Sequence, residues 1–331
     1  MFEGRKKIVG IGSALVDLLL HEEDAFVAAL GAEKGGMTLV DPHFIHNVAS
    51  SAKQPPRVVS GGSSCNTVIG VGRLGGSASF IGKLGNDEFG QIFAEDLRKS
   101  AVDPLLFTSS SPTGRVLSVI TPDAQRTMFT YLGASTELDP AVITPELFTD
   151  TAVLVLEGYM LFNPDLVMAT VQAAKKAGAR VSLDLASFEV VHSSRGLLND
   201  IIRDYVDILI ANEDEAEAFC GHRDEHRLMA HLLDRAPLAA LKLGERGSCI
   251  SYNSQIFRID AHTHRPPIDT TGAGDLWAAG FLFGLVNGYP VDKSGTVGSA
   301  CGYEVCQVVG AKIPDAGWER IRALIASLSE E

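Results

Sequence analysis

The second half of the chain alternates short apolar runs with longer segments that have helical periodicity. The apolar runs have the length of buried strands and lie at 152–156, 180–185, 206–211 and 238–243. The helical segments lie between and after them, at 164–177, 195–205, 213–220, 225–233, 273–287, 293–309 and 318–328. Strands that alternate with helices form a parallel sheet with helices on both faces. We therefore predict an α/β fold with three layers, α/β/α, around a mostly parallel central sheet.

The first half of the chain is less regular and predicts a separate β element. Strand-like pieces at 58–60, 115–121 and 126–131 have no helices between them. The turn residues at 121–125 predict a hairpin between the last two pieces. We expect a single domain over residues 1–331, with a small β-rich subdomain formed from approximately 15–60 and 105–134 and an α/β body formed from the remainder.

Charge and cysteine content exclude several classes of protein. The chain has 28 Lys and Arg against 41 Asp and Glu, and its net charge of −13 opposes binding to nucleic acid or to an anionic membrane surface. Five cysteines without CxxC spacing predict neither a disulfide framework nor a zinc site. The apolar stretch at 8–20 is interrupted by Asp17 and is too short to span a bilayer. We expect a cytoplasmic protein with reduced thiols and no membrane partner.

A glycine-rich turn runs directly into an apolar helix at 268–282, with the sequence Ile-Asp-Thr-Thr-Gly-Ala-Gly-Asp. The amides of Gly272, Ala273 and Gly274 are placed to point together at the helix start, where the helix dipole favours negative charge. They would receive charge on a transferring phosphoryl group, while Asp275 accepts the proton of an attacking hydroxyl. At a helix N-terminus Asp275 is expected to be ionised and only weakly basic. The alternative is an ordinary helix start in which Asp275 is a stabilising first-turn acid.

A second glycine-rich segment begins at Gly61, with the sequence Gly-Gly-Ser-Ser-Cys-Asn-Thr, and is followed by Phe-Ile-Gly-Lys-Leu-Gly-Asn-Asp-Glu-Phe-Gly from Phe80. Paired glycines before a helix let a polar ligand approach backbone amides, and Asn66 offers both a donor and an acceptor to a sugar hydroxyl. Asp17, predicted at the end of the first strand, could accept hydrogen bonds from two hydroxyls. Glycine turns and strand-end aspartates are also commonly structural, so a structural role stays open for each.

These two segments, in this order, resemble the two signatures of the PfkB family of ribokinase-like carbohydrate and nucleoside kinases. The resemblance covers the chain from Gly10 to about Ala311 and implies a ribokinase-like fold in which the β-rich subdomain is a lid. It also implies an ATP-dependent kinase in which Asp275 is the catalytic base and Gly272 to Gly274 form the anion hole. Asp17, Gly62 and Asn66 would bind the phosphoryl acceptor.

Other positions follow from the same resemblance. Asn212 and Glu215 match the family's NxxE element and would hold Mg²⁺ and its waters near the phosphates of ATP. Lys242, Gly244 and Gly247 would border the nucleotide. Asp269 and Thr271 lie where related kinases often place a monovalent cation, which implies a K⁺ site completed by the segment 309–314.

Two segments, 34–41 and 125–134, are similar to bacterial adenosine-kinase-like members of the family. Within them Met37, Leu39, Phe129 and Tyr131 would form an apolar lid over a flat base. Arg126 would neutralise phosphate charge when the lid closes. Alternatively, the apolar side chains only pack the lid against the body or make a dimer contact, and Arg126 is solvated.

The expected function is therefore the phosphorylation of a primary hydroxyl of a nucleoside or sugar by ATP, with adenosine as the first candidate acceptor. One alternative is a sugar kinase of the ribokinase or fructokinase type, and another is a non-catalytic sensor that binds a nucleoside or sugar. The expected partners are these small molecules and ATP, and the chain is expected to be a monomer or a homodimer.

Overall fold

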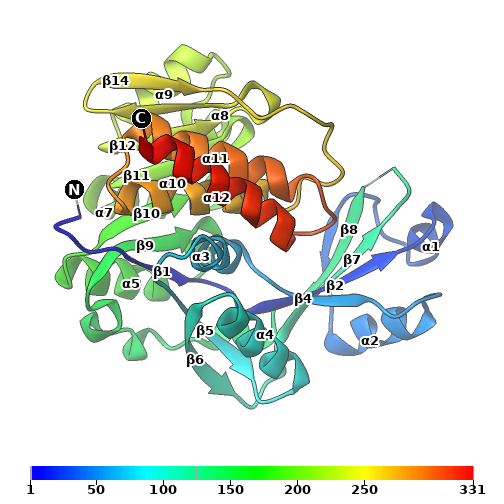
Figure 1. Ribbon diagram of the computed structural model, residues 1–331. Helices are drawn as coiled ribbons and strands as arrows, with labels where there is room; N and C mark the ends of the chain where they lie inside the picture. Colours follow the sequence, from blue (N-terminus) through cyan, green and yellow to red (C-terminus); the bar gives the residue numbers. More distant parts are fainter. Residues whose placement is uncertain (1, 124, 331) are drawn as a thin grey trace.

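The computed structural model describes residues 2–123 and 125–330 and contains a large sheet and a small one (Figure 1). The large sheet has the strand order β14-β13-β12-β11-β10-β9-β1-β5-β6, and its strands from β12 to β6 are parallel. Its strands are β1 (Lys7–Ile11), β5 (Ala78–Gly85), β6 (Val102–Ser109), β9 (Thr151–Glu157), β10 (Arg180–Asp184), β11 (Ile208–Asn212), β12 (Leu238–Lys242), β13 (Ser248–Tyr252) and β14 (Gln255–Ile259). The predicted α/β fold with a mostly parallel sheet is confirmed.

Helices cover both faces of this sheet because each buried strand directs alternate side chains to opposite faces. On one face lie α3 (Ser63–Arg73), α10 (Ala273–Val286), α11 (Val291–Val305) and α12 (Asp315–Glu330). On the other lie α5 (Pro164–Lys176), α6 (Phe188–Ser193), α7 (Arg195–Tyr205), α8 (Glu213–Cys220) and α9 (Glu225–Leu233). Helix α10 has an apolar sequence on all sides, and every residue from Leu276 to Val286 is therefore buried. Its N-terminus therefore has a fixed position at one edge of the sheet.

The small sheet extends to one side of the body, where Figure 1 shows it with two short helices. Its strand order is β3-β8-β7-β2-β4. Its elements are β2 (Leu15–His21), α1 (Asp24–Ala29), β3 (Met37–Leu39), α2 (Pro42–Ser51), β4 (Arg57–Gly61), β7 (Gly114–Ile120) and β8 (Arg126–Tyr131). Helix α4 (Glu88–Lys99) packs next to β4 at the base of this sheet. The predicted hairpin turn at 121–125 contains Ala124, which lies outside the described residues.

The first strand ends earlier than predicted. Strand β1 stops at Ile11, and Asp17 lies within the next strand, β2, in the small sheet. The apolar stretch at 8–20 therefore forms two strands in different sheets, with Gly12 to Ala14 between them. The described residues contain no helix that is long and apolar enough to cross a membrane.

Candidate active site

The N-termini of α10 and α3 meet at Asp275. The Asp275 carboxylate accepts a hydrogen bond from Ser63 Oγ at 2.7 Å and one from Asn66 Nδ2 at 2.9 Å. Thr67 Oγ1 also donates to the carbonyl oxygen of Asp275, at 3.2 Å. Two residues of α3 thus orient the carboxylate, and Ser63 and Thr67 are contacts that the sequence analysis did not identify.

Burial raises the pKa of Asp275 to about 6, although hydrogen bonds from Asn66 and Ser63 lower it and the nearby Asp184 raises it further. The expectation of a weakly basic aspartate is therefore wrong. The helix dipole is outweighed by the loss of solvent around the carboxyl group. A carboxylate with this pKa is still mostly ionised at neutral pH and is a stronger base than a solvated aspartate.

In the turn before Asp275, two of the three amides predicted to form an anion site make no hydrogen bond within the described residues. Gly272 has φ +74°, and a Cβ there would lie 2.6 Å from the Cβ of Ala311, so only glycine fits. The Ala273 amide donates to the carbonyl oxygen of Thr270 at 3.1 Å, which corrects its predicted role as a free donor. Among the described residues, the amides of Gly272 and Gly274 make no hydrogen bond.

A buried ion pair lies against the same turn. Lys242, at the end of β12, donates from Nζ to Asp184 Oδ2 at 2.7 Å, and each side chain is 14% exposed. Burial acts to lower the pKa of Lys242, but Asp184 and Glu215 outweigh it and the pKa is raised, so the ammonium stays charged. The ammonium lies 2.9 Å from the place that a Cβ on Gly274 would occupy. Asp184 was not identified from the sequence, although an acidic residue at the end of a buried strand is a recognisable pattern.

Asn212 and Glu215 are paired with each other at the start of α8. The Glu215 amide donates to Asn212 Oδ1 at 2.9 Å, and Glu215 accepts from the Asn212 amide and from Nδ2, both at 2.8 Å. This is a capping box, which satisfies the first amides of the helix. Burial and Asp184 raise the pKa of Glu215 to about 7. The two residues therefore have a structural role at the start of α8, and their position beside a nucleotide stays a prediction.

The donor set of this region fits a magnesium ion that is bound through water. In residues 2–123 and 125–330, no group of three or more His, Cys, Asp or Glu side chains is placed to hold a metal ion. Mg²⁺ commonly keeps several waters and binds one or two carboxylates together with substrate phosphates. Asp184 and Glu215 are the acidic groups near Lys242 that would meet such an ion through its waters.

A cavity of about 490 Å³ opens beside the turn on the side of Lys242. Its lining includes Gly244 and Gly247, as predicted for the nucleotide side, and also Ala273, Trp277 and Tyr303. Gly247 has φ +84°, and a Cβ there would lie 1.9 Å from the carbonyl oxygen of Ile259, so the loop requires glycine. His262 and Tyr303 also line this cavity, and their ring centroids lie 6.0 Å apart.

On the other side of Asp275 lie the residues predicted to bind the acceptor. Burial raises the pKa of Asp17 to about 6, against the lowering effect of Arg126 and Lys312. Gly61 leaves room for this carboxylate, because a Cβ on Gly61 would lie 2.5 Å from Asp17 Oδ2. The buried Asn66 Oδ1 has no hydrogen-bond partner, so it is free to accept from a ligand hydroxyl.

Arg126 joins the small sheet to the turn before α10. Its guanidinium contacts Thr271 Oγ1 and donates to Ser118 Oγ at 2.9 Å. The face of the small sheet that carries Arg126 therefore faces the body. Strand pairing places Asp17 on the same face. Asp17 pairs with Val116 on β7, and Val116 pairs with Thr130 on β8. Thr130 is four residues after Arg126, and residues an even number apart in a strand point to the same face.

The predicted apolar lid divides between the two faces of this sheet. Met37 and Leu39 are paired with Met128 and Thr130, so they lie on the face of Arg126, and they are 57% and 62% exposed. Phe129 points the other way, is 2% exposed and packs on Phe44 with ring centroids 5.0 Å apart.

Phe129 and Tyr131 belong to the core under α1 and α2. The prediction that they cover a base is therefore wrong, because strand alternation turns them away from the body.

Asp269 and Thr271, the predicted cation ligands, are paired with protein donors. Asp269 Oδ1 accepts from the Thr271 amide at 2.9 Å and from Thr271 Oγ1 at 2.6 Å, and Oδ2 accepts from the Gly310 amide at 2.8 Å. Burial opposes ionisation, yet these hydrogen bonds lower the pKa of Asp269. The segment 309–314 thus contributes an amide donor to Asp269 and fixes the loop behind Gly272.

Glu157, at the end of β9, was not identified from the sequence. It is 2% exposed and accepts from the Ser13 amide at 2.9 Å and the Ser64 amide at 3.0 Å. Burial raises its pKa, while these amide hydrogen bonds lower it. Its carboxylate joins two connections between the small sheet and the body, one before β2 and one after β4.

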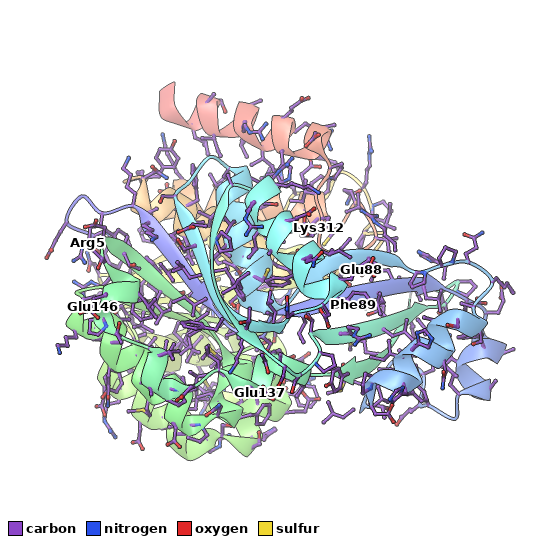
Figure 2. All side chains as sticks on the ribbon, turned by 90° about the horizontal axis from the view of Figure 1, so that it is seen from below. Arg5, Glu88, Phe89, Glu137, Glu146 and Lys312 are labelled. Atoms are coloured by element: carbon purple, nitrogen blue, oxygen red, sulfur yellow. The ribbon has the colours of Figure 1, made fainter. Side chains whose placement is uncertain are left out.

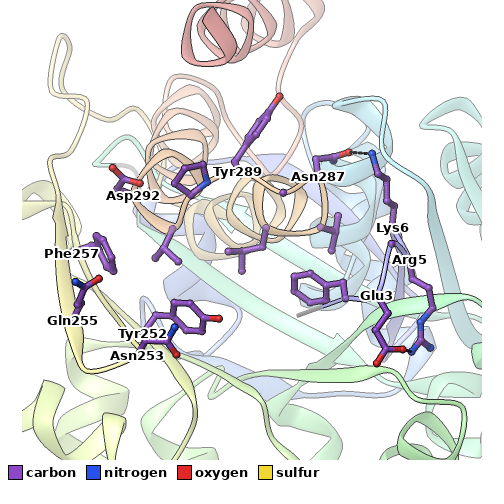
Figure 3. A pocket seen from close by; sticks show the side chains of 17 residues that line it. Glu3, Arg5, Lys6, Tyr252, Asn253, Gln255, Phe257, Asn287, Tyr289 and Asp292 are labelled. Carbon is purple, nitrogen blue, oxygen red and sulfur yellow. Dashed lines mark hydrogen bonds and ion pairs between the residues drawn. The ribbon is translucent and has the colours of Figure 1, made fainter. Parts of the chain in front are cut away.

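A larger cavity, of about 640 Å³, lies elsewhere and contains none of the predicted site residues. Figure 3 shows it between Tyr252 and Phe257 of the β13–β14 hairpin, Asn287 after α10, and Lys6 near the N-terminus. It is at the opposite end of α10 from Asp275, about 20 Å away for a helix of this length. The turn that carries Asp275 therefore borders the smaller cavity and not the larger one.

Comparisons with known proteins agree on one family. The family described as pfkB family carbohydrate kinase matches residues 36–316. Fructokinase-1 of Oryza sativa subsp. japonica is 32% identical over 267 residues, which cover 76% of this chain and 81% of the fructokinase. A probable sugar kinase from Rhizobium etli has a TM-score of 0.88 at 31% identity and covers 98% of this chain and 99% of its own. Adenosine kinase from Sinorhizobium meliloti has a TM-score of 0.86 at 31% identity, covering 99% and 100%.

Proposed function

The chain belongs to the pfkB family of carbohydrate kinases, and we propose that it transfers a phosphoryl group from ATP to a primary hydroxyl of a nucleoside, with adenosine as the first candidate. The observation that carries the proposal is the Asp275 carboxylate, held by Ser63 and Asn66 next to the unpaired amides of Gly272 and Gly274. A base and an anion site side by side are what transfer to a hydroxyl requires.

Kinases of this family use ATP and Mg²⁺. The nucleotide would occupy the 490 Å³ cavity, with Gly244 and Gly247 at its border. Its phosphates would then extend toward Lys242 and the turn at Gly272 to Gly274. Lys242 would neutralise charge on the phosphates, and Asn212 and Glu215 would contact the waters of Mg²⁺. The metal supplies charge neutralisation on the phosphates when bound.

Asp275 would act on the acceptor. As the hydroxyl oxygen forms its bond to phosphorus, its proton passes to the Asp275 carboxylate and the bond to the ADP oxygen breaks. The amides of Gly272 and Gly274 would hold the negative charge of the transferring group in a partly dry site. Asp17 and Asn66 would hold other hydroxyls of the acceptor and so place the reacting one.

Exposed apolar side chains on both sides of the acceptor position favour a nucleoside. Met37 and Leu39 are more than half exposed on the lid face that also carries Asp17 and Arg126. Tyr159 and Phe188, 47% and 48% exposed, follow β9 and β10 at the edge of the sheet where Asp184 and Glu157 lie. A flat base would cover such surfaces, whereas a bare sugar offers little apolar area.

A sugar of the fructose type is the second candidate, supported by the curated relatives, among which fructokinases recur. An ADP-release assay with adenosine, other nucleosides, ribose and fructose at equal concentrations separates the two. We expect the highest kcat/KM with adenosine. A preference for fructose would contradict the proposal that the acceptor is a nucleoside, but it would agree with the proposal that the protein is a kinase.

A non-catalytic sensor is the third candidate. It would be stabilised thermally by a nucleoside or sugar and would release no ADP with any acceptor in Mg²⁺ and K⁺. Asp275, Lys242 and the open turn argue against this, since a binder needs no oriented base.

We also propose that K⁺ binds beside Asp269 and Thr271 and stimulates turnover. A potassium ion could be bound by the remaining lone pairs of Asp269 and by carbonyl groups of the segment 309–314. The guanidinium of Arg126 contacts Thr271 and would compete with the ion. Rates in potassium and tetramethylammonium chloride at equal ionic strength test the proposal, and equal rates would remove it.

A further inference from the structure

Lys312 is a charged residue of the active-site region to which the proposed reaction assigns no role. It lies in the segment between α11 and α12, and its Nζ donates to Ser60 Oγ and to Asp96 Oδ2, both at 2.7 Å. Ser60 is 1% exposed and its amide also donates to Asp96, at 3.2 Å. Figure 2 shows Lys312 beside α4, the helix that carries Asp96.

The three residues come from three separate parts of the fold. Ser60 lies on β4 of the small sheet, Asp96 on α4 of the body, and Lys312 on the loop after α11. The side chains of Lys312 and Asp96 are 18% and 29% exposed, so the pair is partly shielded from water. Burial opposes ionisation of Asp96, but Lys312 and Ser60 lower its pKa, so the pair is charged on both sides.

One end of this network leads to the acceptor. Ser60 is followed by Gly61, whose backbone lies against the Asp17 carboxylate, and by Gly62, which begins α3. Gly62 has φ +96°, and a Cβ there would lie 2.6 Å from the Ser13 carbonyl oxygen. A shift of Ser60 along its strand would therefore move the backbone that surrounds Asp17.

The other end leads to the catalytic turn. Two residues before Lys312, the Gly310 amide donates to Asp269 at 2.8 Å. Ala311 packs against Gly272, where a Cβ on the glycine would come within 2.6 Å of the Ala311 Cβ. Lys312 is therefore attached directly to the loop that supports the anion site.

We propose that Lys312 is a positioning residue that fixes the acceptor strand at Ser60 to the loop behind Gly272, so that the acceptor and the anion site keep a constant separation. It acts through Ser60 and Asp96 and touches neither substrate. The inference rests on the proposed kinase reaction for its kinetic consequences, but the mechanical link itself does not depend on which acceptor binds.

Lys312 also acts on Asp17 electrostatically. The charged or titratable groups that face Asp17 are Arg126 from β8, Lys312 from the loop and Cys65 from α3, whose thiol stays neutral because burial raises its pKa. Removal of the Lys312 charge leaves Arg126 as the cation that favours the Asp17 carboxylate. The pKa of Asp17 should then rise above its present value of about 6.

The test compares Lys312→Met with Lys312→Arg and with the control Lys99→Met. Lys99 lies on the same helix α4 as Asp96 and pairs with Glu95, with side chains 74% and 63% exposed, so its loss removes one positive charge without breaking the network. For Lys312→Met we expect the acceptor KM to rise about tenfold, below the roughly hundredfold loss that an ångström of misplacement can cause. The KM for ATP should change less than twofold, because Lys312 does not line the nucleotide cavity.

Two further readouts separate positioning from a general loss of stability. The acid limb of kcat/KM should move to higher pH in Lys312→Met and stay unchanged in Lys99→Met. Lys312→Arg should restore the acceptor KM to within about threefold, since a guanidinium can still reach a carboxylate. Asp96→Asn should raise the acceptor KM in the same direction, and adding it to Lys312→Met should cause less than an additive loss.

Hydrogen exchange tests the link without any substrate. In Lys312→Met the hydrogen-bonded amides of Ser60, Ala273 and Gly310 should exchange faster, and in Lys99→Met none of them should. The proposal is overturned if Lys312→Met lowers only the melting temperature, with the acceptor KM, the pH profile and the exchange of Ala273 and Gly310 unchanged. If the wild type releases no ADP with any acceptor, the proposed reaction fails, and the exchange experiment still decides the link.

Discussion

At the scale of single residues, Asp275 shows how one side chain is both oriented and activated. Ser63 and Asn66 hold its two oxygens, and burial raises its pKa to about 6 in spite of them. The hydrogen bonds alone would make a poor base, and desolvation alone would leave the carboxylate unoriented. The combination gives a carboxylate that is oriented, more basic than a solvated aspartate and still mostly ionised at neutral pH, as the proposed base must be.

Asp275→Asn should lower kcat by about a hundredfold to ten-thousandfold, the usual contribution of a general base. Its stability should not fall at pH 7.5. The pKa of Asp275 is about 6 in the folded state and 3.8 ordinarily, so the folded state binds the proton more tightly than the unfolded state. The free energy of unfolding therefore falls as pH rises from about 3.8 through about 6. Asn does not titrate, so the variant does not lose this stability. The measurements are ADP release and thermal melting at pH 7.5.

Asp292→Asn is the matched control, because Asp292 is also a first-turn acid of a long helix but is exposed and remote from the site. It should leave kcat unchanged. Near-native turnover in Asp275→Asn would remove Asp275 from its role as the base.

The pH dependence of the wild type should report two carboxyl groups. Asp17 and Asp275 both have a pKa raised to about 6, so kcat/KM for the acceptor should fall steeply as pH drops below about 6. In Asp17→Asn the decline should become shallower, as expected for a single proton. Steady-state rates from pH 5 to 8, with fluorescence checks that the fold is intact, measure this. A flat profile down to pH 5 would contradict both assignments.

At the scale of elements, the start of α3 carries most of the connections of the site. The helix supplies Ser63 and Asn66 to Asp275, and its Ser64 amide donates to Glu157. Since Glu157 also holds the Ser13 amide, the same carboxylate joins the entry to β2 and the exit from β4. A buried carboxylate that accepts amide hydrogen bonds is stable there, whereas an unpaired one would be costly.

Gly62→Ala should destabilise the fold more than Gly75→Ala, although the two glycines bound the same helix and have φ of +96° and +88°. Both substitutions place an L residue at positive φ, and Gly62, with ψ 136°, also lies outside the left-handed helical region that L residues can reach at about 1–2 kcal/mol. Only Gly62 adds a contact, at 2.6 Å from the Ser13 carbonyl oxygen, while the space around Gly75 is open. Urea unfolding measures the difference. Equal decreases in the free energy of unfolding would show that the segment around Ser13 relaxes around a side chain at position 62 without losing stability.

At the scale of the whole molecule, the proposed acceptor site lies between a body and a small sheet that contact each other through Arg126 and Thr271. The small sheet keeps a core of its own under α1 and α2, so it can move as a unit. Exposed Met37 and Leu39 on its inner face lose contact with water only when something covers them. Ligand binding and closure should therefore be coupled.

Adenosine should slow hydrogen exchange across β3 and β8 and raise the melting temperature, with a gain near 3 kcal/mol at about a hundred times Kd. Met37→Ser combined with Leu39→Ser should weaken adenosine binding and leave ATP binding unchanged. Ile256→Ser, a substitution of a residue 58% exposed on β14, is the control for lost surface apolarity. Equal adenosine affinity in the double variant would defeat the assignment of this face to the base.

The sequence by itself determined the α/β fold and the chemical character of the site. Both depend on short-range signals: apolar runs that alternate with helical segments, and glycine turns whose backbone only glycine adopts. Asp275, Lys242 and Gly272 lie next to such signals in the chain, so the short stretch of sequence around each was enough to single it out as a candidate site residue. The family of kinases was accessible for the same reason, because its signatures are continuous stretches of chain.

Only the tertiary structure decided which partners those residues have and which way they face. Ser63 and Asp275 are 212 residues apart in the chain, and no local pattern reports their hydrogen bond. Phe129 and Met37 differ in face because of strand register, which is a property of the paired sheet. The raised pKa of Asp275 likewise comes from burial by distant segments, and burial exists only after the chain has folded.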